Sequence, residues 1–524
     1  MVKPLVFARA QTDAGAMETP KPTRRSGGRK TRHAKRAAPP AINPCPPGQT
    51  GGQYRPLTEK DCQDIFAMAL RLLDQLGMGE VPQGLAQRLV SHGARAMGDR
   101  IHIPEKLTLA AIQTAAKSFP LYGLEPARNI TVGGSAVHFG TGGAAVQVLD
   151  LNNGSYRPST LRDLYDFTRL QDILPNVSWF TRCCIATDMN SEWALDINTA
   201  FALLKGTTKP VATAFTLPEH VAPIVDMLDM AAGHAGGFSA RPWLKAHISP
   251  VISPMRYGAD AVAVMEQCFK HNIPVSAITA AQSGATAPAT LAGFLAQSLA
   301  ETLASLLVTH VTKPGHPTVF SNWPLVIDLR TGAFCGGGGE ISVMNAASAQ
   351  LSNWLGLPSG VACSMTDSKA IDAQYGMEKG ISAMAAGLAG GNLIYESSGM
   401  TASLLGASFE AFVLDNDMIG HIYRALRGIE VTPETLNYED IASAVLGDGH
   451  FLGAAATMAA MERDYFYPAL ADRDQPVTWA EKGQPEAWGR ANAAARDILE
   501  SHHPNHLGRG LEKDIRARFD IRLT

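Results

Sequence analysis

The stretch with the most distinctive chemistry is LVIDLRTGAFCGGGGE, which runs from Leu325 to Glu340. A short apolar run ends in Asp328 and Arg330, and four consecutive glycines, Gly336 to Gly339, then precede Glu340. Ordering four glycines costs considerable backbone entropy, so such a loop usually exists because a bulky group must approach its backbone. Taken alone, the loop is equally well interpreted as a flexible connector. Its place in the order of the chain decides between the two.

Short apolar or β-branched runs alternate with amphipathic segments of ten to twenty residues from about residue 136 onward. The predicted strands span residues 136–143, 178–184, 209–216, 243–253, 273–280, 316–327, 359–366 and 392–398. Strict alternation of strands and helices implies a parallel sheet, and eight such units predict an α/β protein with a (β/α)8 TIM barrel. A doubly wound sheet is the alternative fold. The lack of GxGxxG after the first strand, and of GxxxxGK[ST] anywhere, weakens that alternative.

Two further regions precede the predicted barrel. Residues 1–50 carry ten Lys/Arg against two acids, a charge of +8, and predict a disordered basic tail. Such a tail suits nucleic acid or an acidic partner, or is simply solvated. Residues 51–130 predict a helical N-terminal segment, in which Thr58 and Asp61 form an N-terminal capping pattern. The barrel then occupies residues 131–510.

The overall composition is that of a globular protein with a large core, since 46% of the 524 residues are hydrophobic and 18% are charged. We expect no membrane span, because no apolar run approaches the ~20 residues required, and no signal peptide, because the N-terminus has no apolar h-region. The seven cysteines are scattered, without CxxC pairs. This usage favours reduced thiols and a cytoplasmic location.

A TIM barrel carries its chemistry at the C-terminal ends of the strands, which we call the barrel mouth. The glycine loop and Glu340 follow the sixth strand and therefore fall there, which favours a functional interpretation of the loop. The mouth is rich in aromatic residues and acids, and such walls suit a cation, because aromatic rings attract ammonium groups. Phe139 and Phe215 are better explained as barrel core, on base rates of burial. No HExxH, GxSxG or CxxC pattern predicts a metal site or a hydrolytic triad.

Several long motifs resemble the trimethylamine:corrinoid methyltransferase family, in the same order and over nearly the whole chain. They are RRSGGRKTRHAKRAA (24–38), LDLNNGSYRPSTLRDL (149–164), SGATAPATLAGFLAQSLAE (283–301), VIDLRTGAF (326–334), MTDSKAIDAQYGMEK (365–379) and GHFL (449–452). The resemblance implies a barrel that moves a methyl group from an amine to the cobalt of a corrinoid (cobalamin). That corrinoid is carried by a separate corrinoid protein, so no metal is expected in this chain. A homo-oligomer is also expected.

The founding members of that family contain pyrrolysine, whereas all 524 positions here are standard residues. The resemblance therefore implies a substrate that is already a good methyl donor, such as glycine betaine or a related quaternary amine. Demethylation of trimethylamine, a lyase that uses no corrinoid, and a betaine-binding protein without turnover are the alternatives. DGHFLG (448–453) matches the cobalt-binding pattern DxHxxG, but too few residues follow it for a corrinoid domain, and we interpret the match as chance.

On this resemblance, each candidate residue at the mouth is given a role. The catalytic candidates, for charge balance or hydrogen bonding, are Glu340, Asp367, Tyr395 and Glu396. The substrate-binding candidates are Phe139, Phe215, Gln282, Trp323, Arg330 and His450. The candidates for contact with the corrinoid are Gly140, Thr141, Gly142, Gly336, Gly337, Gly338, Gly339 and Lys369.

Overall fold

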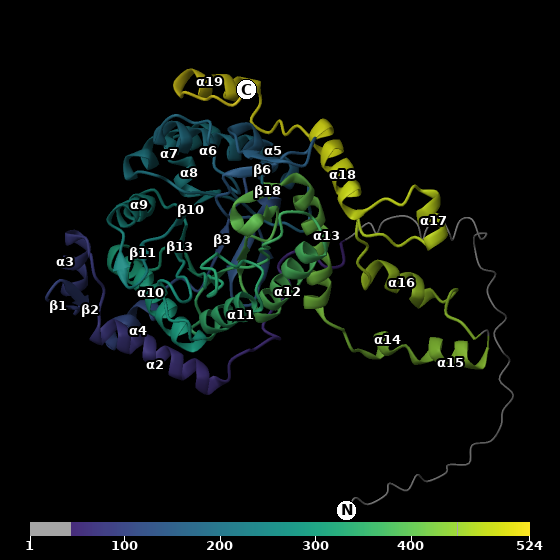
Figure 1. Ribbon diagram of the computed structural model, residues 1–524, viewed down its shortest axis with the longest axis horizontal. Coiled ribbons are helices and arrows are strands. Elements are labelled where there is room, and N and C mark those ends of the chain that lie inside the picture. Colours follow the sequence, from purple (N-terminus) through teal and green to yellow (C-terminus); the bar gives the residue numbers. More distant parts are fainter. Residues whose placement is uncertain (1–42, 448) are drawn as a thin grey trace, which may run out of the picture.

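The eight predicted strands form one parallel sheet in the computed structural model, which describes residues 43–447 and 449–524 (Figure 1). In chain order they are β5 (His138–Phe139), β8 (Phe180–Thr181), β9 (Val211–Thr213), β10 (Leu244–Ile248), β13 (Val275–Thr279), β14 (Thr318–Asn322), β15 (Ser359–Ala362) and β16 (Leu393–Tyr395). Each lies inside one of the predicted ranges. Most of the predicted basic tail, and Asp448 of the DxHxxG match, lie outside the described residues.

The sheet closes on itself. Its strand order is β5-β16-β15-β14-β13-β10-β9-β8, and a parallel bridge between Gly140 and Trp179 joins the two ends. The Ser178 N–H also donates to the Phe139 carbonyl oxygen at 2.9 Å. A Cβ on Gly140 would lie 2.1 Å from the Trp179 ring, so glycine is required where this ring packs against the seam. The predicted TIM barrel is confirmed.

A helix follows each strand and surrounds the barrel (Figure 1). These helices are α5 (Leu161–Asp172), α6 (Glu192–Gly206), α7 (Val221–Ala232), α9 (Ala259–Lys270), α10 (Leu291–Thr312), α11 (Gly339–Trp354), α12 (Ala373–Ala389) and α13 (Phe409–Arg427). The barrel also contains the short helix α8 (Gly237–Ala240), the strand pair β11 (Val251–Ile252) and β12 (Arg256–Tyr257), and 3-10 turns at Pro218–His220 and Ala402–Leu404.

Helix α10 corrects one expectation. Its 22 residues are long and apolar enough to cross a membrane by length and composition, and no other described helix is. The helix is mostly buried, because it packs between strands β13 and β14 and the N-terminal helix α2 (Glu59–Gln75). An apolar helix that is mostly buried in this way is typical of the core of a large barrel.

The N-terminal segment is helical, as predicted, and also contains two antiparallel strand pairs. Besides α2, its helices are α3 (Gln83–Ser91) and α4 (Glu105–Thr114). Its strand pairs are β1 (Arg95–Met97) with β2 (Arg100–His102), and β3 (Ser118–Leu121) with β4 (Ile130–Gly133). A 3-10 turn at Pro126–Arg128 lies between β3 and β4. Thr58 is the N-cap of α2: its side chain accepts from the Asp61 N–H, while the Asp61 carboxylate accepts from the Thr58 N–H. This confirms the predicted cap.

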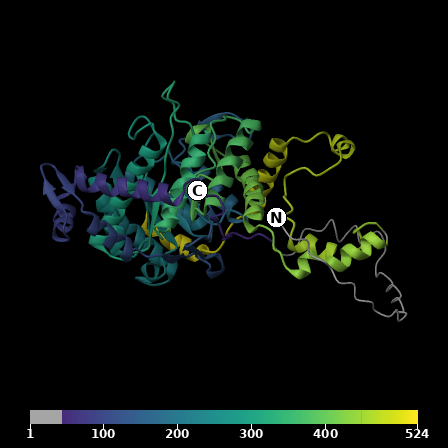
Figure 2. The ribbon, with the colours of Figure 1, turned by 90° about the horizontal axis from the view of Figure 1, so that it is seen from below.

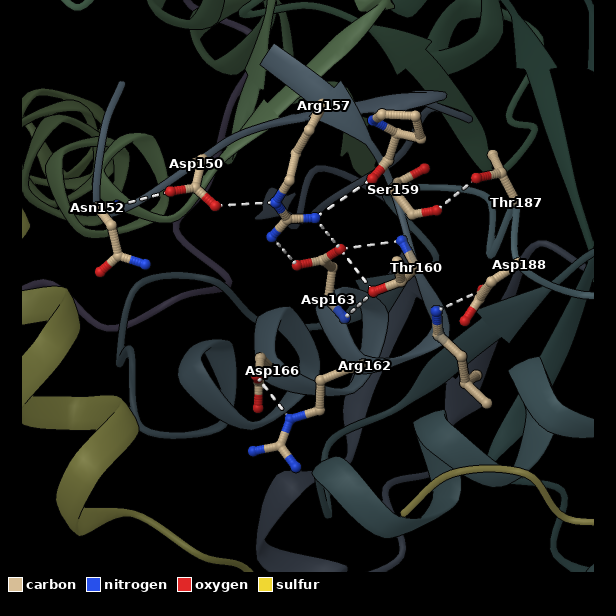
Figure 3. A network of polar contacts seen from close by, with 12 residues as sticks. Asp150, Asn152, Arg157, Ser159, Thr160, Arg162, Asp163, Asp166, Thr187 and Asp188 are labelled. Carbon is tan, nitrogen blue, oxygen red and sulfur yellow. Dashed lines mark hydrogen bonds and ion pairs between the residues drawn. The ribbon is translucent and has the colours of Figure 1, made fainter. Parts of the chain in front are cut away.

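A small sheet continues from the ends of β5 and β16. Its strands are β17 (Met400–Thr401), β18 (Gly406–Ser408), β6 (Gln147–Leu149) and β7 (Tyr156–Pro158). Arg157 of β7 forms two 2.7 Å bonds to Asp163 and one of 2.9 Å to Asp150, and Thr160 with Asp163 caps α5 (Figure 3). Asp150, Arg157, Thr160 and Asp163 of the motif 149–164 therefore bond to one another, and this network fixes the start of α5.

The chain after α13 leaves the barrel. Helices α14 (Pro433–Leu436), α15 (Tyr438–Leu446), α16 (Ala455–Arg463) and α17 (Pro476–Glu481) form a projecting arm (Figures 1 and 2). The chain then returns through α18 (Ala487–Ser501), which packs on α13 and α5, and α19 (Arg509–Arg518), which packs on α7. The domain boundaries at residues 50, 130 and 510 stay a prediction.

Candidate functional site

A cavity of about 620 Å³ opens at the barrel mouth. Its wall includes aromatic, charged and small residues that lie at or just after the ends of six strands, namely Gly143, Arg182, Phe215, His247, Trp323 and Glu396. A larger cavity, of about 820 Å³, lies between α13 and the arm, near the C-terminal end of α13. Because α13 runs back against the strands, that cavity lies toward the opposite end of the barrel. The smaller cavity is therefore the candidate site.

Glu396 is the most unusual residue of this cavity. It directly follows β16, is fully buried, and has a left-handed backbone with φ of +64°. Neither carboxylate oxygen has a hydrogen-bond partner of normal geometry, although the Gly143 N–H is near enough to lower the pKa. Burial dominates and raises the pKa of Glu396 to about 8. An unpartnered buried carboxylate with a strained backbone is costly, and such features cluster at functional sites.

The glycines after β5 make room for this carboxylate. A Cβ on Gly142 would lie 2.7 Å from the Glu396 Oε1, and one on Gly143 would lie 2.9 Å from Oε2. Gly143 also has φ of +91°, which favours glycine. Gly142, one of the glycines predicted to admit a corrinoid, therefore makes room for the side chain of Glu396.

The nearest buried lysine does not form an ion pair with Glu396. Lys379 lies 3.1 Å from an Asp415 carboxylate oxygen and donates to the Met400 carbonyl oxygen at 3.3 Å. Asp415 also accepts from the Tyr375 hydroxyl at 2.6 Å and the Gly399 N–H at 2.8 Å. The charge of Lys379 lowers the pKa of Glu396 but does not offset burial. Glu396 is left to face the cavity without a bonded cation.

Aromatic rings form the floor of the cavity. The Trp323 and Tyr395 ring centroids lie 4.9 Å apart, and His247 packs edge-on against both, at 5.3 Å and 5.6 Å. Phe215 lines the cavity as well. Burial, and the charges of Lys245 and Arg182, hold the pKa of His247 well below its usual range. A neutral aromatic floor beside an unpartnered carboxylate suits a methylated ammonium group.

Lys245 lies beneath this floor, inside the barrel. Its Nζ donates to the Tyr395 hydroxyl at 2.9 Å and to the Ser276 Oγ at 3.0 Å, and no described acid forms an ion pair with it. Burial lowers the pKa of Lys245 to about 7. Our sequence analysis missed Lys245 and His247. Alternate residues of one strand face the same side, so their spacing in WLKAHIS was a usable signal.

The glycine-rich loop is held by a different acid. The Gly336 and Gly337 N–H groups donate to the two oxygens of Asp367 at 2.7 Å and 3.2 Å, and the Ser403 hydroxyl donates to the same carboxylate at 2.8 Å. Glu378 accepts from the Asp367 N–H at 2.9 Å, and a Cβ on Gly337 would lie 2.1 Å from its Cδ. The loop is therefore fitted around two carboxylates.

Phe215, Trp323 and Glu396 are the predicted residues that line the cavity, and Tyr395 packs against Trp323. Phe139 lies in the core, 5.2 Å from the ring of Tyr423. The other candidates do not line the cavity, namely Thr141, Gln282, Arg330, Gly338, Gly339, Glu340, Lys369 and His450 in the arm. Three of them donate to a neighbour instead: Thr141 to the Thr181 carbonyl oxygen, Arg330 to Asp328 and Lys369 to the Asp367 carbonyl oxygen. The roles given to these residues stay predictions.

No three His, Cys, Asp or Glu side chains within residues 43–447 and 449–524 are placed to hold a metal ion. The chain matches the sequence model of the family described as Trimethylamine methyltransferase (MTTB) over residues 25–522. The chain belongs to this family. Membership accounts for the barrel and for a methyltransferase activity on methylated amines.

Three relatives illustrate the range of the family. A trimethylamine methyltransferase of Methanosarcina mazei is 30% identical over 80% of this chain and 85% of its own length. One from Desulfitobacterium hafniense is also 30% identical, over 88% of this chain and 92% of its own. A glycine betaine methyltransferase of Desulfitobacterium hafniense is 25% identical over 90% of this chain and 97% of its own. Identity at this level does not choose between the two substrates.

Proposed function

We propose that the protein transfers a methyl group from a quaternary amine, glycine betaine or a related betaine, to the Co(I) corrinoid of a separate corrinoid protein. The observation that carries this proposal is the unpartnered carboxylate of Glu396 beside the Trp323 and Phe215 rings. A permanent cation satisfies both features at once. The rings attract it, and it compensates a carboxylate that no described side chain pairs.

The main role of this chain in the proposed reaction is to bind and orient the substrate. The corrinoid supplies a strong nucleophile, and the C–N electron pair leaves with a neutral tertiary amine, so no proton donor is required. The chain must hold the ammonium in one position and keep one N-methyl group directed out of the cavity. Tyr395, held by Lys245 and Ser276, fixes the aromatic floor against which the cation packs.

The cavity suits approach by a second molecule. Its volume of about 620 Å³ exceeds what a small methylated amine fills, and it opens at the strand ends rather than inside the barrel. The glycine-rich loop follows β14 on the same face. We infer that the corrinoid protein docks over this opening, and that the protein acts in the cytoplasm as a homo-oligomer.

The test is a spectral assay with purified protein, its corrinoid protein and chemically reduced corrinoid. Glycine betaine, proline betaine, carnitine, choline and trimethylamine are added in turn. Conversion to the methylated corrinoid with a quaternary amine, and none with trimethylamine, is the expected result. Conversion with trimethylamine alone would assign the other known substrate of the family. A product formed without corrinoid would instead support a lyase, and binding without turnover a betaine-binding protein.

A further inference from the structure

Arg182 is a second charged group in the cavity wall, at the end of β8. Its main-chain N–H donates to the Ala212 carbonyl oxygen at 3.2 Å, which continues the pairing of β8 with β9. Thr181 and Cys183 on either side are fully buried. The side chain therefore leaves a rigid backbone and reaches the same cavity as Glu396.

The guanidinium of Arg182 makes no hydrogen bond or ion pair with any described residue. The acid whose charge most affects it is Asp196, but Asp196 accepts from the Thr216 N–H at 2.6 Å, the Thr216 hydroxyl at 2.8 Å and His220 Nδ1 at 2.8 Å. Arg169, a buried arginine of α5, shows the usual arrangement of a buried guanidinium, because it donates hydrogen bonds to Asp166 and to two carbonyl oxygens. Arg182 thus offers five N–H donors to the cavity with no internal acceptor.

Two opposite charges line one cavity and do not pair with each other. Glu396 is unpartnered at one part of the wall, and Arg182 is unpartnered at another. The remaining acid of the wall, Asp260, is exposed at the start of α9. A ligand with a cation alone would compensate Glu396 and leave the partly exposed guanidinium of Arg182 without an acceptor. A zwitterion compensates both.

We infer that Arg182 binds the carboxylate of the methyl donor, and that the cavity selects a quaternary ammonium carboxylate over a quaternary ammonium alcohol or a simple amine. This inference rests on the proposed function and narrows it. A planar guanidinium matches a carboxylate through two parallel N–H···O bonds, which a hydroxyl group cannot reproduce. Arg330, which our sequence analysis names among the substrate-binding candidates, is 88% exposed and already donates to Asp328 at 2.8 Å.

The experiment is calorimetric titration of glycine betaine and choline into wild type, Arg182→Gln and Arg330→Gln. These ligands share the trimethylammonium group and differ in carrying a carboxylate or a hydroxyl. We expect Arg182→Gln to weaken glycine betaine binding by roughly ten- to a hundredfold, the loss of a charge-assisted pair. Choline binding should change by less than about threefold, and Arg330→Gln should alter neither. Arg182→Lys should recover part of the affinity, because it retains the charge without the fork.

Unchanged choline binding also shows that the Arg182→Gln variant is folded. The inference is overturned if Arg182→Gln leaves glycine betaine affinity intact, or weakens both ligands equally. The corrinoid assay separates this failure from failure of the proposed function. Turnover of choline and glycine betaine with equal efficiency would retain the methyltransferase and remove the carboxylate site. Binding of betaine that depends on Arg182, without methyl transfer, would support the carboxylate site and contradict the methyltransferase activity.

Discussion

Asp367 and Glu396 are acids that follow neighbouring strands, β15 and β16, at the same end of the barrel. Asp367 accepts from two loop amides and a serine hydroxyl, so its carboxylate is already satisfied. Glu396 is more deeply buried and has no partner of normal geometry. The comparison teaches that position at the mouth does not identify the site. What distinguishes the two acids is whether the fold itself supplies their hydrogen bonds.

The largest expected effect comes from Glu396→Gln, which removes the charge but retains the shape. We expect binding of quaternary amines, and kcat/KM of methyl transfer, to fall roughly ten- to a hundredfold, the usual value of a charge-assisted contact. Asp367→Asn is the matched control, and amine binding should change by less than about threefold. Equal losses in the two variants would contradict the distinction between them.

The pH dependence of amine binding should follow Glu396. A cation binds the ionised carboxylate, so affinity should rise about tenfold per pH unit as pH increases toward 8 and then level off. Lys245, whose pKa is lowered to about 7, loses its charge in the same window and acts in the same direction. Titrations of wild type and Glu396→Gln from pH 6 to 9 separate the two groups. Any pH dependence of affinity that persists in Glu396→Gln belongs to Lys245. If the variant keeps the full pH dependence of wild type, Glu396 is not the group that titrates.

The same shift determines a change in stability. The pKa of Glu396 is raised when folded, so the folded state binds the proton more tightly than the unfolded state. Its contribution is therefore present at low pH and is lost as pH rises from about 4.5 to about 8. Urea unfolding of wild type should show this loss relative to Glu396→Gln. A difference that is independent of pH would show that the group does not titrate there.

Amide substitution of the two acids should have different effects on the free energy of unfolding. Asp367→Asn weakens three hydrogen bonds to the carboxylate, and we expect the free energy of unfolding to fall by about 1–3 kcal/mol. Glu396→Gln loses no bond of this kind and should leave stability at neutral pH unchanged or slightly higher. Urea denaturation at pH 7.5 measures both. A larger loss in Glu396→Gln would show that its carboxylate is structural.

The smallest effect is expected within the glycine loop. Gly337→Ala places a Cβ 2.1 Å from the Glu378 Cδ, and Glu378 must move away from the Asp367 N–H and the Thr366 hydroxyl to which it is bonded. We expect a loss of about 1 kcal/mol in the free energy of unfolding. Gly339→Ala is the control, because no atom lies within 4 Å of its Cβ position and α11 begins there. Equal stabilities of the two variants would indicate that the loop is not fitted around Glu378.

The barrel could be predicted from the sequence because each strand is a short apolar run between helical segments. The sequence predicts which residues lie at the mouth only from their position after a strand. Glu340, Asp367 and Glu396 therefore receive the same predicted role. Their separation depends on partners from distant segments, such as Ser403 for Asp367, and no spacing in the sequence encodes those contacts. Arg182 lies in the predicted strand at residues 178–184 but is not among the candidates, since its lack of an acceptor is visible only in three dimensions. The GHFL motif likewise gave no sign that His450 is exposed in the arm.

The central claim is that the unpartnered Glu396 binds the cationic nitrogen of the methyl donor. The most direct measurement is calorimetric titration of glycine betaine and of 3,3-dimethylbutanoate, its uncharged carbon isostere, into wild type and Glu396→Gln at pH 8.5. The account predicts that wild type binds glycine betaine at least about tenfold more tightly than the isostere, and that this preference largely disappears in the variant. Equal affinity of wild type for the two ligands would contradict it, because the cavity would then recognise shape and carboxylate without recognising the ammonium charge.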